Sequence, residues 1–215
     1  MLTRFKLLGA AAVAAVLMAV PAQAATVIDF STGMAGQGGT ITWDGSNLIG
    51  SNIPIGSVAI AGAPANNGVY AVSGSATGQG GSSFGSLNFN TATNVISITG
   101  CIADLSIGVG ALGQCAPVTL MEGSFASWNA SASNGLLNAT GQDIKNTALL
   151  EAINWPSTLP WEFFGFSLTS APLVPGTPGP VISTDIRNTP VPEPATMMLL
   201  GTGLLAAFRA RRRQA

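Results

Sequence analysis

The chain has 215 residues, of which only 8% are charged, and its formal net charge is -1. It contains no histidine, which excludes Ser-His-Asp hydrolases, Cys-His proteases and zinc sites with histidine ligands. Between residues 25 and 190, two basic residues stand against eight acidic ones, a net charge of −6. Such a surface repels phosphate, so nucleic acid is not expected as a partner.

The first 24 residues have the three regions of a bacterial secretory signal peptide. Basic residues at positions 4 and 6 precede an apolar run over residues 7–20, and Ala22 and Ala24 are the small residues that a signal peptidase requires. An uncleaved anchor is disfavoured, because this run reaches only about 21 Å as a helix and the hydrocarbon core is roughly 30 Å thick. We therefore expect export through the general secretion machinery and cleavage by signal peptidase, with Ala25 as the mature N-terminus.

Residues 25–190 are predicted to form a single all-β domain. Apolar and polar residues alternate with the period of a strand at 40–44, 86–90 and 94–99. Further strand-like runs, separated by turn signals such as Asn67-Gly68 and Asn134-Gly135, lie at 28–30, 58–61, 69–73, 117–122, 125–130, 163–170 and 181–186. Many short strands of this kind are typical of a β-sandwich or jelly roll.

One short helix is predicted within this domain, at residues 143–154. The segment lacks glycine and proline, Thr140 precedes it as a cap with Asp143 three residues later, and Pro156 ends it. Lys145 interrupts its apolar stripe. We expect this helix to lie across the sandwich or to close one of its ends.

Cys101 and Cys115 are the only cysteines, an even count in a chain bound for an oxidising compartment. A catalytic thiol is the alternative, but the chain has no histidine to act as its base. We therefore predict a disulfide that fixes the base of the loop at residues 102–114, with a stabilisation of roughly 3 kcal/mol in the chain-entropy model.

Few residues suggest catalysis or metal binding. Glu122, Glu151 and Glu162 are available for a glycosidase with paired carboxylates, but acidic residues of a solvated surface look the same in sequence. Oxygen donors at residues 44–47 lack the full ligand pattern of a calcium loop and are predicted to form a turn. The sequence therefore predicts a protein that is not an enzyme and holds no metal or cofactor.

The four tryptophans, Trp43, Trp128, Trp155 and Trp161, leave two interpretations open. They could stack on sugars if they were exposed, or they could fill the core of a small β-domain. Two of them on one exposed face would favour a carbohydrate-binding module, and burial of all four would favour a non-catalytic surface protein.

The C-terminus carries a second short apolar run, with its charges at the opposite end. Residues 195–208 contain no charge and are followed at once by Arg209, Arg211, Arg212 and Arg213. Clustered arginines resist translocation, so the run is predicted to be a stop-transfer signal that forms a single membrane helix. Because the run is short and relies on arginine snorkelling to span, we expect a temporary hold in the inner membrane.

The segment Val191-Pro192-Glu193-Pro194 stands immediately before this run. Its two prolines remove amide donors and keep the chain extended at the membrane face, and Glu193 offers one charge that an enzyme could grip. A helix-entry linker with an incidental glutamate is the alternative. The motif, apolar run and basic cluster, in this order and spacing, resemble the PEP-CTERM sorting domain.

The resemblance implies that an exosortase, a membrane-embedded transpeptidase-like cysteine enzyme, cuts near the motif and releases or re-anchors the protein. Family members are typically exported by Gram-negative bacteria that produce exopolysaccharide and form biofilms. Residues 28–30 and 183–186 also resemble, more loosely, β-rich domains found upstream of such signals. We expect a signal peptide (1–24), an extracytoplasmic domain (25–190) and a sorting signal (191–215).

Two functional hypotheses follow. The first is a non-catalytic cell-surface or extracellular-matrix protein, processed by exosortase and linked to exopolysaccharide and biofilm. The second is a carbohydrate-binding module that acts on exopolysaccharide. In both, the protein is transiently anchored in the inner membrane and is then located at the cell surface or outside the cell.

Overall fold

The computed structural model describes residues 26–156, 161–189 and 202–203. This part of the chain forms twelve strands: β1 (Val27–Ser31), β2 (Thr40–Trp43), β3 (Leu48–Ile55), β4 (Ser57–Ala61), β5 (Gly68–Ala71), β6 (Ala76–Thr77), β7 (Ser83–Asn90), β8 (Val95–Gly100), β9 (Val118–Ser131), β10 (Leu136–Lys145), β11 (Trp161–Ser170) and β12 (Gly179–Thr189). It also contains the helix α2 (Thr147–Ala152) and the short 3-10 turns η1 (Gly33–Ala35), η2 (Gln79–Gly81), η3 (Ala103–Leu105) and η4 (Ala132–Asn134). The predicted all-β class with one short helix is confirmed.

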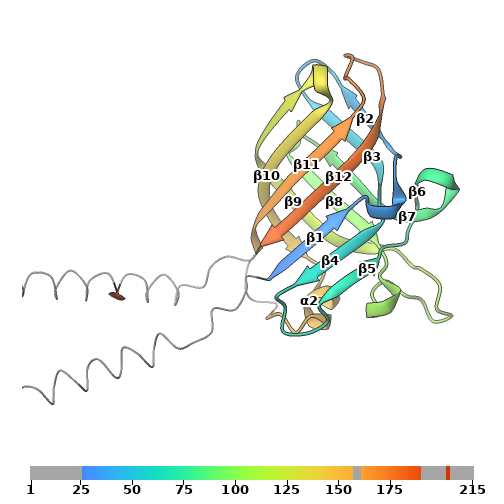
Figure 1. Cartoon of the computed structure of the whole chain (residues 1–215), viewed down its shortest axis with the longest axis vertical. Coiled ribbons are helices and arrows are strands. Elements are labelled where there is room, and N and C mark those ends of the chain that lie inside the picture. Colours follow the sequence, from blue (N-terminus) through green and yellow to red (C-terminus); the bar gives the residue numbers. More distant parts are fainter. Residues whose placement is uncertain (1–25, 157–160, 190–201, 204–215) are drawn as a thin grey trace, which may run out of the picture.

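Eight of the strands form one closed, barrel-like antiparallel sheet, in the order β11-β10-β9-β8-β7-β3-β2-β12 (Figure 1). Closure is made by β12, which pairs with β11 along one edge and with β2 at the start of the other edge. The structure thus differs from the predicted sandwich, in which two separate sheets would face each other. A closed sheet has no free edge along its path, and free edges are where sheets aggregate.

The remaining part of the second edge of β12 pairs with β1, and β1 is followed by β4 and β5. In this pairing Ile28 lies opposite Asn188, so the first and last strands of the described domain run side by side (Figure 1). The chain therefore enters and leaves the domain at neighbouring points of one end.

Apolar side chains at alternate strand positions fill the interior of the closed sheet. Four phenylalanines form its centre: Phe89, Phe125, Phe164 and Phe166, with ring centroids 5.3 to 6.1 Å apart in the contacting pairs. All four are buried. The interior is therefore a packed core, and edge-to-face aromatic contacts of this kind add to its stability.

The predicted helix at residues 143–154 begins too early. Strand β10 continues to Lys145, and the helix α2 starts only at Thr147, where Asn146 Oδ1 accepts a hydrogen bond of 2.9 Å from the amide of Ala148. Thr140 lies inside β10 and caps nothing. Lys145, which interrupted the apolar stripe of the predicted helix, points into the closed sheet and is buried.

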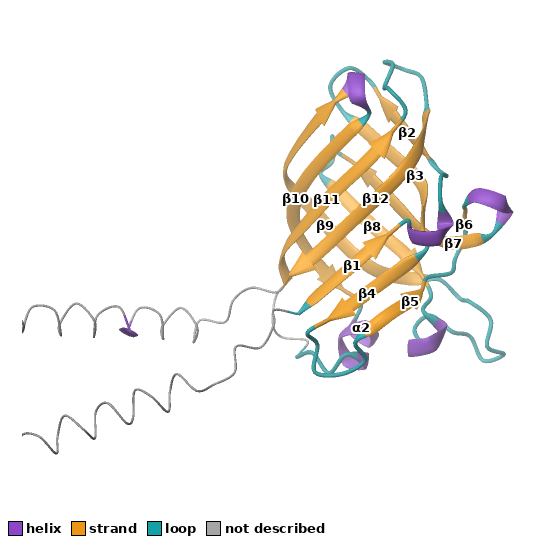
Figure 2. Cartoon of the chain, in the orientation of Figure 1, coloured by secondary structure: helices purple, strands orange, loops and turns teal. Residues whose placement is uncertain are grey.

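Helix α2 lies at one end of the closed sheet, as the sequence led us to expect of the helix (Figure 2). Its Leu149 and Leu150, together with Ile153 just after it, are buried against the core. At the same end Trp155 contacts Trp161, with ring centroids 5.4 Å apart.

The predicted disulfide between Cys101 and Cys115 is confirmed, with the two Cα atoms 5.7 Å apart. Cys101 also forms an isolated bridge with Ser73, and Cys115 forms one with Val109. The loop at residues 102–114 is therefore held at its base, as expected.

Within residues 26–156, 161–189 and 202–203, no helix is long and apolar enough to cross a membrane. The predicted signal peptide with Ala22, Ala24 and Ala25 lies outside the described residues. So do the sorting segment at 191–194, the arginine cluster at 209–213 and, apart from residues 202–203, the apolar run at 195–208.

Candidate functional site

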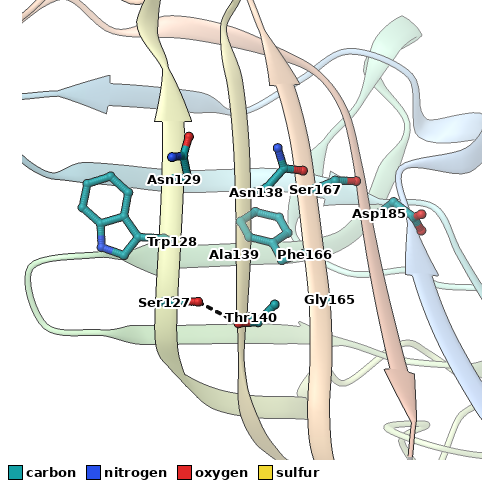
Figure 3. A pocket seen from close by; sticks show the side chains of 10 residues that line it. All are labelled: Ser127, Trp128, Asn129, Asn138, Ala139, Thr140, Gly165, Phe166, Ser167 and Asp185. Atoms are coloured by element: carbon teal, nitrogen blue, oxygen red, sulfur yellow. Dashed lines mark hydrogen bonds between the residues drawn. The ribbon is translucent and has the colours of Figure 1, made fainter.

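A groove of ≈ 540 Å³, lined by both polar and apolar residues, crosses the outer face of strands β9 to β12. Cross-strand pairing places four exposed polar side chains in one row across these strands: Asn129, Asn138, Ser167 and Asp185 (Figure 3). Beside this outer row, Ser127 and Thr140 share a hydrogen bond of 2.9 Å. The row thus presents two amides, a hydroxyl and a carboxylate, which can hydrogen-bond a polar ligand.

The row continues beyond the groove onto the next two strands. Asp185 pairs with Ser31 of β1, which pairs with Ser57 of β4, and the two serine hydroxyls are 3.0 Å apart. In the neighbouring row, Arg187 pairs with Asp29. The outer face therefore presents a polar stripe that spans six strands.

The pKa of Asp29, which lies beside this stripe, is raised. Burial of its carboxyl, and then its hydrogen bond and charge repulsion with Asp185, raise the pKa of Asp29 to about 7, although Arg187 acts in the opposite direction. Asp29 therefore keeps its proton to a higher pH than an exposed aspartate does, which lowers the negative charge beside the groove.

Of the three glutamates singled out from the sequence, Glu122 and Glu151 are not among the residues that line the groove, and the side chain of Glu162 lies outside the described part of the structure. Glu122 is exposed on β9, and Glu151 is exposed on α2.

The oxygen donors at residues 44–47 form the predicted turn. Asp44 Oδ1 accepts hydrogen bonds from the amides of Ser46 (2.7 Å) and Asn47 (2.6 Å), and these bonds lower the pKa of Asp44. Within the described part of the chain, no group of three or more His, Cys, Asp or Glu side chains could hold a metal ion.

The tryptophans do not form an exposed platform. Trp161 is buried, and Trp43, Trp128 and Trp155 are half-buried and packed against the core. Trp128 pairs with Ala139 on the inner face and also lines the groove. The arrangement is closer to the core interpretation than to sugar stacking.

Comparison with protein families adds information on the C-terminal region. A family model described as the PEP-CTERM protein-sorting motif matches residues 190–213. The chain carries a PEP-CTERM sorting motif. The match includes the segment at 191–194 and the arginines up to Arg213 that were singled out from the sequence.

The PEP-CTERM motif identifies an exported protein that is processed by an exosortase and is transiently anchored in the membrane beforehand. The motif follows directly on β12, so the sorting signal continues from the last strand of the closed sheet. No curated protein and no solved structure matches the chain.

Sequence reasoning did not find the outer row. Its members come from separate strands, and each is an ordinary serine, asparagine or aspartate in its own segment. Only the pairing register brings them together. The only sequence sign of the row is that exposed residues of β10 and of β11 recur at every second position, which places them on one face of the sheet.

Proposed function

We propose that this protein is a non-catalytic component of the cell surface or extracellular matrix, delivered by exosortase and associated with exopolysaccharide. The PEP-CTERM motif at residues 190–213 is the observation that carries the proposal. The disulfide between Cys101 and Cys115 suits an oxidising compartment, and the groove lacks a nucleophile with a histidine base.

The fold suits delivery of this kind. Each of the eight strands of the closed sheet has a neighbour on both sides, which limits edge-to-edge association outside the cell, while the short strand β5 ends the β1-β4-β5 extension. Both ends of the domain lie at one end of the sheet, as β1 and β12 pair there. The outer row therefore stays accessible on the side of the sheet when the C-terminal tail is bound at the membrane.

Substitution of the central residues of the sorting motif should block processing. With Pro192→Ala, Glu193→Gln and Pro194→Ala combined, we expect the precursor to remain membrane-bound with its tail intact, because the extended segment and its charge are what the exosortase would grip. Tail mass and membrane fractionation, in hosts with and without the exosortase, measure this. Glu151→Gln, an exposed carboxylate on α2, is the matched control and should be processed normally.

The basic cluster should act differently. Replacing its four arginines by glutamine should weaken retention, since the apolar run alone reaches only about 21 Å, and the chain should pass through uncut. If the wild-type chain keeps residues 195–215 in hosts with and without the enzyme, the segment is a permanent anchor and the proposal fails.

A second candidate function is direct binding of exopolysaccharide in the groove. The amide and hydroxyl groups of the outer row favour it, and two aromatic residues, Trp128 and Phe166, are among the described residues that line the groove. The absence of an exposed tryptophan pair from the described residues makes hydrogen bonding, rather than stacking, the source of affinity.

Replacement of both groove amides tests this second function. Asn129→Ala combined with Asn138→Ala should raise the Kd for the host's purified exopolysaccharide roughly 30-fold, because two side chains with net hydrogen-bond contributions of about 1 kcal/mol each are lost. Gln142→Ala, an exposed amide on β10 outside the groove, should leave the Kd unchanged. Equal affinities of all three proteins would rule out the groove as the binding site.

A further inference from the structure

A cluster of three polar side chains is sealed inside the closed sheet. Lys145 Nζ donates a hydrogen bond to Asp143 Oδ2 and a second one, of 2.9 Å, to Asn188 Oδ1. The side chains of Lys145 and Asp143 are fully inaccessible to solvent, and Asn188 is equally buried. The ammonium also lies 5.2 Å from the ring centroid of Trp161, within the range of a cation–π contact.

The amide of Asn188 is held in one orientation. Its Nδ2 donates to the backbone carbonyls of Ile28 (2.9 Å) and Ile186 (3.1 Å), on β1 and β12. Carbonyl oxygens only accept hydrogen bonds, so the amide nitrogen must face them and Oδ1 must face Lys145. The carbonyl group of Asn188 is therefore presented to the lysine amine.

The surroundings make the Lys145 amine easier to deprotonate. Burial lowers the pKa of Lys145 to about 8, although Asp143 opposes this, and burial raises the pKa of Asp143. Asp143 Oδ1 is buried and has no hydrogen-bond partner among the described residues. Transfer of a proton from Nζ to Asp143 would remove both charges from the interior and leave a nucleophile against the carbonyl of Asn188.

We propose that Lys145 and Asn188 become joined by an intramolecular isopeptide bond, with Asp143 as the acid–base group. Nζ attacks Cγ of Asn188, the Nζ–Cγ bond forms and the Cγ–Nδ2 bond breaks. Asp143 passes the proton that it has taken from Nζ to the departing nitrogen, which leaves as ammonia. It then takes the second proton that Nζ loses on becoming an amide, so Asp143 ends protonated and the new amide is neutral. No oxidant or cofactor takes part.

The bond would fasten the strand that leads to the sorting motif. It joins β10 to β12 across β11, between residues 43 apart in sequence. Because residues 190–213 follow β12 directly, tension on the C-terminal tail would act on a strand that is covalently tied to the closed sheet.

The test uses the full-length protein recovered from an exporting host, reduced, denatured and digested with trypsin. Between residues 25 and 190, trypsin has only two sites, Lys145 and Arg187. With the bond, the protein is lighter by one ammonia, cleavage after Lys145 is lost, and the peptide that begins at Asn188 is found attached to the peptide that contains Lys145.

Three variants locate the bond. Asn188→Ala should restore cleavage after Lys145, and Lys145→Arg should restore cleavage at its own position, each without loss of ammonia. Asn138→Ala, an outward-facing asparagine on β10, should keep the cross-link.

Two results would overturn the proposal, and both come from the wild-type protein, so they do not depend on a variant that fails to fold. One is full mass with complete cleavage after Lys145, which means a buried ion pair only. The other is a loss of water with Lys145 linked to Asp143.

Discussion

Phe125→Ala is expected to lower the free energy of unfolding by about 3–5 kcal/mol. The Phe125 ring contacts those of Phe89, Phe164 and Phe166, with centroid distances of 6.1, 5.8 and 6.1 Å, so its removal leaves a cavity in the middle of the aromatic core. Denaturant unfolding should show a lower midpoint with an unchanged slope. For a domain of this size the melting temperature should fall by roughly 10 °C.

Ile144→Ala is the control for this change. Ile144 lies on β10 next to the core, but its side chain is 77% exposed, so its truncation should change the stability by no more than about 0.5 kcal/mol. If Phe125→Ala lowers the free energy of unfolding as little as Ile144→Ala does, the four rings do not form the centre of the core.

The strands could be predicted where burial alternates locally. In β8, Ile96 and Ile98 are buried and Ser97 between them is only half-buried, so the sequence pattern and the structure coincide. Strand β9 was predicted as two strands, at residues 117–122 and 125–130. The structure instead continues the strand through Gly123 and Ser124, which pair with β10 on one side and β8 on the other.

Closure of the sheet could not be predicted from local patterns. It depends on β12 pairing with β2, a strand from the other end of the domain in sequence, as well as with its neighbour β11. Alternation within one strand says which face is buried, but it does not say which strand lies beside it.

The error at residues 143–154 has a related cause. Thr140 and Asp143 imitate a helix cap, and the absence of glycine favours a helix, yet Lys145 finds its buried partner Asn188 in β12. Tertiary contacts of this kind override local propensity. The sorting motif was found from sequence because all its parts are contiguous, whereas the groove is assembled from four strands.

Gly141→Ala is expected to destabilise the domain by about 1–3 kcal/mol, while Gly165→Ala should change its stability by no more than about 0.5 kcal/mol. A Cβ at Gly141 would lie 2.0 Å from the carbonyl oxygen of Ser124 and 2.7 Å from the ring of Phe164, whereas a Cβ at Gly165 would meet no atom within 4 Å.

The two glycines lie on adjacent strands, β10 and β11, and both substitutions restrict the unfolded chain to a similar degree, so that contribution cancels in the comparison. The remaining difference measures the close packing of β10 on its neighbours, at the point where the register of β9 and β10 shifts. Parallel denaturant titrations of the two variants give this difference. If both variants unfold at the same midpoint, the backbone at Gly141 has room to move, and the contact with Ser124 does not fix the position of β10.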